Sequence, residues 1–163
     1  MFRFIQGLIS ISIQNSVLVL YDNDAEGVTS YERTRELNIP PNMCILKLPD
    51  LQAFRQFKTE GPNGAALADI NGRAAAIECY LDFEESPSVR WTAYNAKLDA
   101  YQGELINKER FARSFLKQKG SLSGYDYSRI EAVLDMIVQS CASMKEKEQL
   151  ALLVDFAARD AEE

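Results

Sequence analysis

The chain has 163 residues, of which 47% are apolar and 10% aromatic, enough for one globular domain with a buried core. It contains no histidine, which excludes Ser–His and Cys–His nucleophile pairs and any imidazole metal site or base. Catalysis would therefore have to use carboxylates, lysine, tyrosine or a carboxylate-bound metal. Cys44, Cys79 and Cys141 form no CxxC pair, which argues against a disulfide framework and predicts buried, reduced side chains.

The formal net charge is −6, but it is unevenly distributed. Residues 1–120 carry 14 Lys/Arg and 15 Asp/Glu, whereas residues 121–163 carry 4 and 9. Nucleic-acid binding is not excluded, although no basic stripe argues for it. No apolar segment approaches the roughly 20 residues that span a bilayer, so we expect a cytoplasmic protein without a membrane partner.

The first predicted elements form a strand–helix–strand unit. The opening "MFRFIQGLISISI" is interpreted as an amphipathic or buried element, because a strand pattern follows it directly. The apolar run at 16–21 is typical of a strand buried in a parallel sheet, and the charges at 25–37 are spaced for a helix. "NIPPN" ends that helix and "MCILKL", 43–48, predicts a second strand. Together they predict a βαβ crossover.

The middle of the chain is less regular. Residues 49–72 resemble a loop with turn residues at 61–64, and "GRAAAIECYLDF", 72–83, predicts a short helix with Asn71 as its N-cap. Residues 88–105 predict either a hairpin or an irregular extension. We expect the aromatic residues of this segment to pack in the core or against a subunit rather than to stack on nucleobases; they are Trp91, Tyr94 and Tyr101.

The remainder is predicted to be helical. A helix over 107–119 ends near Gly120, and residues 120–125 form a hinge. After the hinge, apolar residues recur at helical spacing and are expected to pack on the α/β core; they are Ile130, Val133, Leu134, Ile137, Val138, Cys141 and Met144.

Asp22 and Asp24 directly follow the first strand of the βαβ unit. Open α/β sheets place ligands at this end of their strands, and two carboxylates in a DxD arrangement can share a hard divalent cation such as Mg²⁺. Glu26 and Gly27 add a third carboxylate and a tight turn. The alternative is that Asp24 caps the helix and Asp22 only solvates the turn. Both interpretations remain open on the pattern alone.

The segment "VLVLYDNDAEG" resembles the second conserved block of the Toprim (topoisomerase–primase) domain, a hydrophobic strand that ends in DxD. Its continuation, "IPPNMCILKLPDLQAF", "DINGRAAAIECYL" and "VRWTAYNAKLDAYQGEL", is similar to the C-terminal part of bacterial HEPN/Toprim-associated proteins of phage defence, over roughly residues 5–118. The resemblance implies a nuclease site in which Asp22 and Asp24 hold Mg²⁺ or Mn²⁺. Asp69 and Glu78 are weaker candidate ligands, and Arg73 could clamp a phosphate.

One departure from the family concerns the catalytic glutamate block that precedes DxD. Only 21 residues precede Asp22, and none of them is acidic. We therefore expect an N-terminally truncated Toprim-like domain, which implies a homo-oligomer or a companion defence subunit, because an incomplete sheet exposes unpaired backbone.

The sequence thus predicts an α/β fold: an incomplete, Toprim-like parallel sheet over 1–118 and a C-terminal helical segment over 119–163. The leading function is the Toprim portion of a Mg²⁺-dependent nuclease that acts on DNA or RNA and needs a partner. The alternatives are a non-catalytic regulatory or assembly subunit, and phosphoryl-transfer chemistry on an acidic strand–helix elbow.

Overall fold

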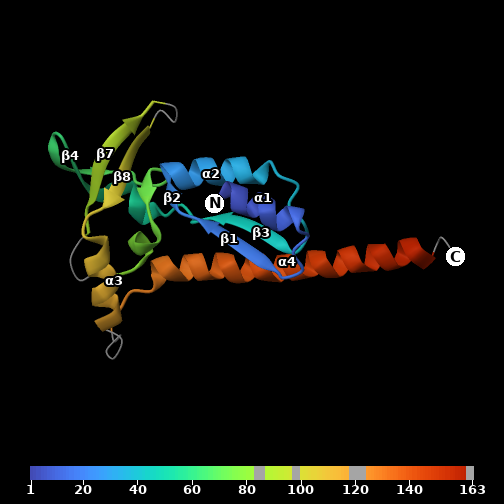
Figure 1. Ribbon diagram of the computed structural model, residues 1–163. Helices are drawn as coiled ribbons and strands as arrows, with labels where there is room; N and C mark the ends of the chain where they lie inside the picture. The colour runs from blue at the N-terminus through green and yellow to red at the C-terminus, as the bar shows by residue number, and fades with distance from the viewer. Residues whose placement is uncertain (83–86, 97–99, 118–123, 161–163) are drawn as a thin grey trace.

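The computed structural model describes residues 1–82, 87–96, 100–117 and 124–160. It has an α/β fold with a long C-terminal helix, which confirms the predicted fold class (Figure 1). The predicted boundary between residues 118 and 119 lies outside the described residues.

The predicted βαβ unit is confirmed. Strands β1 (Val17–Tyr21) and β3 (Met43–Lys47) pair in parallel from Val17↔Met43 to Tyr21↔Lys47, and α2 (Ala25–Arg35) connects them. Because the two strands run in the same direction with no offset, their carboxyl ends meet at one edge of the β1–β3 layer. This edge carries Asp22.

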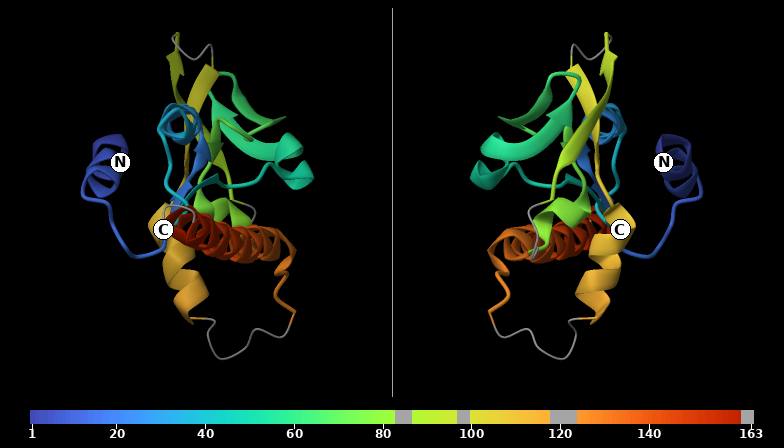
Figure 2. Two further views of the ribbon diagram at one scale, coloured as in Figure 1. Left: turned by 90° about the vertical axis from the view of Figure 1, so that its right-hand side faces the viewer. Right: turned by 90° about the vertical axis from the view of Figure 1, so that its left-hand side faces the viewer.

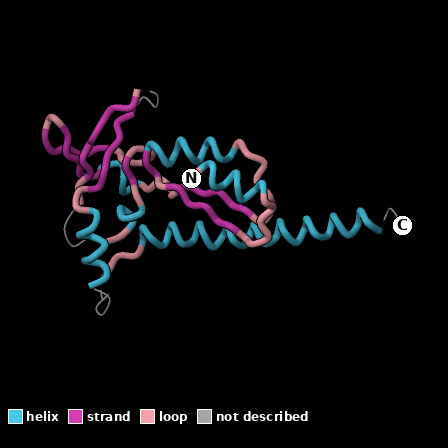
Figure 3. The backbone as a smooth tube through the Cα atoms, viewed as in Figure 1, coloured by secondary structure: helices cyan, strands magenta, loops and turns pink. Residues whose placement is uncertain are grey.

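Helices cover both faces of the β1–β3 layer. On one face, α1 (Phe2–Ser10) and α2 pack on a cluster that includes Ile5, Val19 and Met43. On the other face lies α4 (Ser128–Asp160), whose Val133 is 1% exposed and joins the main core cluster. Figures 1 and 3 show α4 running beneath the two strands and continuing past them. The amphipathic element expected at the N-terminus is thus α1.

A second, mixed sheet has the strand order β5-β4-β7-β8. Its strands are β4 (Phe57–Gly61), β5 (Gly64–Ala68), β7 (Val89–Asn95) and β8 (Ala100–Leu105), preceded by the 3₁₀ helix η1 (Gln52–Gln56). The hairpin expected at 88–105 is therefore present. The prediction of a loop over 49–72 is wrong, because this segment contains η1, β4 and β5. Only the predicted turn is present, where Gly64 adopts a φ of +93° between β4 and β5. End-on views show this sheet on the side opposite α1 (Figure 2).

The short helix predicted over 72–83 is wrong. Ala74–Ala75 form strand β6, which pairs antiparallel with β2 (Asn23–Asp24), and a single 3₁₀ helix, η2 (Ile77–Tyr80), follows. The run of alanines favours a helix by propensity, but burial and pairing override that preference, since both strand residues of β6 are at most 2% exposed. Asn71 consequently caps no helix.

The C-terminal helices are confirmed in position. Helix α3 (Lys108–Lys117) follows β8, while most of the predicted hinge lies outside the described residues. The apolar stripe of α4 is only partly used: Ile130, Val133, Ile137 and Met144 pack inward, whereas Leu134, Val138 and Cys141 are exposed. Within the described part of the chain, no helix has the length and apolar character needed to cross a membrane.

Two expectations about side chains are corrected in part. Cys79 is buried as expected, but Cys44 is half-buried and Cys141 exposed. Trp91 packs against the main core cluster, whereas Tyr94 and Tyr101 are 52% and 53% exposed and contact each other edge-on with ring centroids 5.2 Å apart.

Candidate functional site

The turn from β1 into α2 is built by the backbone of Asp22 and Asp24. Asp24 is the N-cap of α2: it adopts extended geometry, and its Oδ1 accepts a hydrogen bond from the Gly27 N–H at 2.6 Å. A Cβ on Gly27 would lie 2.2 Å from the Asp22 carbonyl oxygen, so the turn accepts only glycine there. The capping interpretation of Asp24 is therefore confirmed, and it still leaves the second carboxylate oxygen for a ligand.

Asp22 lies at the lip of the β1–β3 layer. Its Oδ1 accepts a hydrogen bond from the backbone N–H of Ile77 at 3.1 Å, which ties the turn to η2. Burial raises the pKa of the Asp22 carboxyl, and the negative charge of Asp24 raises it further. The Ile77 N–H and the positive charge of Lys108 oppose that rise only partly. Two carboxylates thus repel each other at a partly buried position.

Glu78 adds a third negative charge to this neighbourhood. It lies in η2, and its charge acts on Asp22 in the same direction as that of Asp24. Its side chain is 16% exposed, and its Oε2 lies 3.0 Å from the Lys108 ammonium. That oxygen is buried and accepts no well-directed hydrogen bond from any described residue. The structure therefore brings Glu78 close to Asp22, as a carboxylate already balanced by a lysine.

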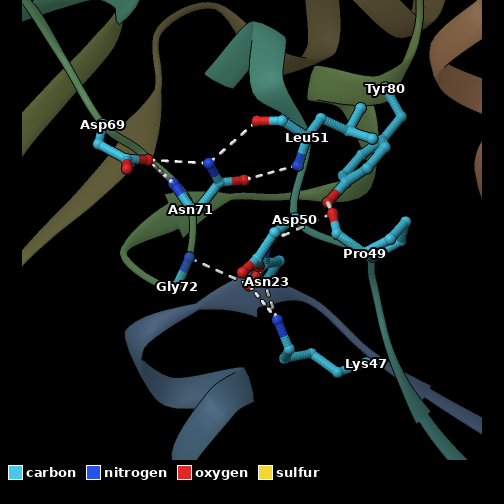
Figure 4. A network of polar contacts seen from close by, with 9 residues as sticks. All are labelled: Asn23, Lys47, Pro49, Asp50, Leu51, Asp69, Asn71, Gly72 and Tyr80. Carbon is cyan, nitrogen blue, oxygen red and sulfur yellow. Dashed lines mark hydrogen bonds and ion pairs between the residues drawn. The ribbon is translucent and has the colours of Figure 1, made fainter. Parts of the chain in front are cut away.

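Asp69 is held in a separate set of contacts. Its Oδ1 accepts hydrogen bonds from both the backbone and the side chain of Asn71 at 2.9 Å, and Asn71 in turn bonds the backbone of Leu51 in both directions (Figure 4). These contacts fix the loop that leads into β6. Asp69 thus acts as a turn residue in the observed geometry, on a different segment from the Asp22–Asp24 pair.

Arg73 is placed beside Asp24 by the backbone. The two residues form an isolated bridge, and the Arg73 carbonyl accepts a hydrogen bond from the Ala25 N–H at 3.4 Å. The Arg73 side chain is exposed, and no ion pair with Asp69 occurs among the residues that the structure describes. A guanidinium at this position is available to an anionic ligand of the turn.

The residue between the two aspartates is the most enclosed polar group of the site. Asn23 is 0% exposed, and sequence reasoning missed it. Its Oδ1 accepts hydrogen bonds from the Lys47 ammonium at 2.7 Å and from the Gly72 N–H at 3.0 Å, while its Nδ2 donates to Asp50 Oδ1 at 2.8 Å (Figure 4). Asn23 therefore joins the ends of β1 and β3 to the loop before β6.

Lys47, Asp50 and Tyr80 complete this network. Partial burial works against ionisation of Asp50, but hydrogen bonds from Lys47 and Asn23 hold the pKa of its carboxyl below the ordinary value. Tyr80 donates its hydroxyl to the Pro49 carbonyl at 2.6 Å, and burial raises the pKa of that hydroxyl. The sequence feature that could have pointed to Lys47 and Asp50 is the "KLPD" that ends the second strand, because parallel strands bring their carboxyl ends together.

The donor set suits a hard divalent cation in kind. Carboxylate oxygens are the ligands that Mg²⁺ and Mn²⁺ prefer, and a cation beside Asp22 would relieve its repulsion with Asp24. Within the described ranges, no group of three or more Cys, His, Asp or Glu residues is arranged to hold a metal ion. A cation here would therefore rely on the two aspartates, with water completing its shell.

The chain was compared with models of protein families, with curated proteins and with solved structures, and nothing matched. Its function is therefore inferred from the residues and their geometry.

Proposed function

We propose that the chain is the Toprim-like portion of a Mg²⁺- or Mn²⁺-dependent nuclease that acts on DNA or RNA in bacterial defence against phage. We place it in the cytoplasm, working as a homo-oligomer or with a companion subunit. The observation that carries this proposal is the placement of Asp22 and Asp24 at the carboxyl end of the parallel strand β1, where each carboxylate uses one oxygen for a backbone hydrogen bond and keeps the other for a ligand. The negative charge of Asp24 adds to burial in raising the pKa of Asp22, and a bound cation would offset both effects.

In this proposal, each residue of the turn has a defined task. Asp22 and Asp24 would hold the metal ion with the oxygens that their backbone hydrogen bonds leave available. The bound ion would supply charge stabilisation for attack on a phosphodiester. Arg73, exposed beside Asp24, would orient the phosphate, and Asn23 would fix the backbone that carries both aspartates.

Metal binding can be tested without knowing the partner. Asp22→Asn keeps an acceptor for the Ile77 N–H, and Asp24→Ser keeps an N-cap for α2, so both remove a carboxylate while preserving the fold. Titration of the full chain with Mn²⁺, followed by the paramagnetic spectrum of the free ion, should show a bound ion that is lost in both variants. Asp69→Asn, whose carboxylate belongs to another loop, should bind as the wild type does.

The same variants should abolish Mg²⁺- or Mn²⁺-dependent cleavage of plasmid or RNA wherever the wild type cleaves. Failure of the wild type to bind Mn²⁺, or equal binding by all three variants, would contradict the metal site.

A second candidate function is a non-catalytic assembly subunit of such a defence complex. It is favoured by the exposed apolar residues near the C-terminal end of α4, where Leu150, Leu152, Leu153 and Val154 are each 60–66% exposed. In that case Asp22→Asn and Asp24→Ser would leave complex formation unchanged, and no metal would support cleavage.

A further inference from the structure

We propose that the outward surface of α3, formed by Arg110, Arg113 and Lys117 and called the basic face below, binds the phosphodiester backbone of a nucleic acid. The choice of a nucleic acid rests on the proposed function, since a nuclease must hold its substrate beside the reacting site. The charge and geometry of the basic face stand independently of the metal site.

Helix α3 concentrates positive charge in an acidic protein. Its ten residues include four cations and a single acidic residue, Glu109, whereas the whole chain has a net charge of −6. Glu109 pairs with Arg113 at 3.2 Å, but the two side chains are 86% and 76% exposed. Water and salt screen the attraction within such a pair strongly, so Arg113 can exchange Glu109 for a phosphate at little energetic cost.

The orientation of α3 separates its cations into two groups. Lys108 reaches inward to Glu78 at 3.0 Å and anchors the helix start beside η2. At about 100° per residue, Arg110, Arg113 and Lys117 fall within about 60° of one another on the opposite side of the helix. All three are exposed, and they share with Asn107, Lys108 and Glu109 the lining of an open hollow of about 620 Å³ along α3.

The spacing of the basic face fits a phosphate backbone. Arg110 and Lys117 are seven residues apart, which corresponds to a rise of about 10 Å along the helix. Successive phosphates of one strand in a duplex advance by about 3.4 Å along its axis, so the face can meet about three of them. Guanidinium groups bind phosphate oxygens in a bidentate manner, and Arg113 can do so by releasing its exposed partner Glu109.

The position of α3 links this surface to the aspartates. The Lys108 that anchors the helix also acts electrostatically on Asp22. The basic face lies on the opposite side of α3 from Lys108, so a strand held there would have to pass around the helix to reach the acidic lip of β1, where its charge alone would be repelled. The division into a basic binding surface and an acidic reacting surface is what a metal-dependent phosphodiesterase requires.

Fluorescence anisotropy of the full chain in EDTA tests this proposal. Labelled single-stranded DNA, duplex DNA and single-stranded RNA of equal length are titrated over a series of salt concentrations. The triple variant Arg110→Gln, Arg113→Gln, Lys117→Gln should bind at least tenfold more weakly than the wild type at low salt. The slope of log affinity against log salt should decrease in magnitude by about 2 to 3, since up to three phosphate contacts are lost.

The matched control removes the same charge elsewhere. Arg3→Gln, Lys145→Gln, Lys147→Gln alters exposed residues of α1 and α4 and should keep the wild-type affinity and slope. Circular dichroism checks that both triple variants are folded. The proposal would be overturned if both triple variants bound equally weakly, or if the wild type bound none of the three nucleic acids. Displacement of the nucleic acid by polyglutamate at equal charge concentration would also overturn it and would indicate an acidic protein partner.

The basic face and the metal site can fail separately. Asp22→Asn and Asp24→Ser should keep full nucleic-acid binding in EDTA, because the basic face needs no cation. If the chain binds nucleic acid but no Mn²⁺, the proposed nuclease is disproved and the basic face is supported. If it binds Mn²⁺ but no nucleic acid, the basic face is disproved and the metal site is supported.

Discussion

At the scale of single residues, the "DND" at 22–24 assigns a different task to each position. Asp24 caps α2, Asn23 is buried as a hydrogen-bonding hub, and Asp22 remains half-buried with only one backbone donor. Asp22 is thus a carboxylate whose ionisation the fold disfavours, because burial and Asp24 both raise its pKa. Its charge is a cost to stability that a ligand can remove.

This cost predicts a pH-dependent effect of Asp22→Asn. A raised pKa in the folded state means that the contribution of Asp22 to stability is complete below its ordinary pKa of 3.8 and is lost as the pH rises through the folded value. The variant has no such loss, so its melting temperature should exceed that of the wild type by an amount that grows from about pH 3 to pH 7. Thermal melts followed by circular dichroism at several pH values measure this difference.

Added Mg²⁺ should raise the melting temperature of the wild type and leave that of Asp22→Asn unchanged, since only the folded wild type binds the ion. If Asp22→Asn is less stable than the wild type by the same amount at about pH 3 and at about pH 7, Asp22 is needed for its hydrogen bonds alone.

The sequence was sufficient to place Asp22 and Asp24 at the end of a buried strand, because an apolar run followed by polar residues marks that position. It was not sufficient to find Asn23 as the centre of the site. The contacts of Asn23 come from Lys47, Asp50 and Gly72, which are 24, 27 and 49 residues away. Their convergence depends on the register of β1 with β3 and on the pairing of β6, and no local pattern encodes either.

At the scale of elements, the predictions succeeded where the apolar pattern was continuous and failed where it was weak or absent. The β1–α2–β3 unit was found because its apolar runs are continuous and a proline pair ends the helix. Strand β6 was taken for a helix because two residues show no period, and their strand conformation comes only from pairing with Asn23–Asp24. Strand β5 was missed because it consists of glycine, alanine and one leucine, which lack strand preference.

The two helices on the same face of the β1–β3 layer offer a matched pair of glycine substitutions. Alanine is a better helix former than glycine by about 1 kcal/mol, and an alanine Cβ at Gly7 of α1 would meet nothing within 4 Å. Gly7→Ala should therefore increase the free energy of unfolding by about 0.5 to 1 kcal/mol. At Gly27 of α2 the same Cβ would lie 2.2 Å from the Asp22 carbonyl oxygen, so Gly27→Ala should decrease it by at least about 2 kcal/mol.

Urea denaturation of both variants measures these changes. If both substitutions increase the free energy of unfolding, the turn between β1 and α2 can relax around a side chain at position 27.

At the scale of the whole molecule, α4 continues past the β1–β3 layer on which it packs (Figure 1). Its 33 residues extend about 50 Å, and beyond Met144 it exposes a run of apolar side chains over 150–154. Consecutive residues of a helix point in all directions, so this run is apolar all round, as in helices that are buried by neighbours. The expected homo-oligomer or companion subunit would have its contact surface here.

We therefore expect the wild-type chain to sediment as a dimer or larger assembly at micromolar concentration. The double variant Leu150→Glu, Leu153→Glu should sediment as a monomer, because assembly would require two carboxylates to be desolvated in the contact. Leu67→Glu on β5, where the leucine is 67% exposed, is the control and should keep the wild-type assembly. A wild-type chain that sediments as a monomer would locate any partner surface elsewhere.

The hydrogen bond from Gly72 to Asn23 also has a kinetic meaning. It joins two residues 49 positions apart and ties the turn with its two aspartates to the loop before β6. Contacts between distant residues form late, since the entropy of closing a long loop must be overcome first. During refolding, the βαβ unit should therefore gain its secondary structure before the turn becomes ordered, and occupancy of the turn by a cation would mark the last step of the folding pathway.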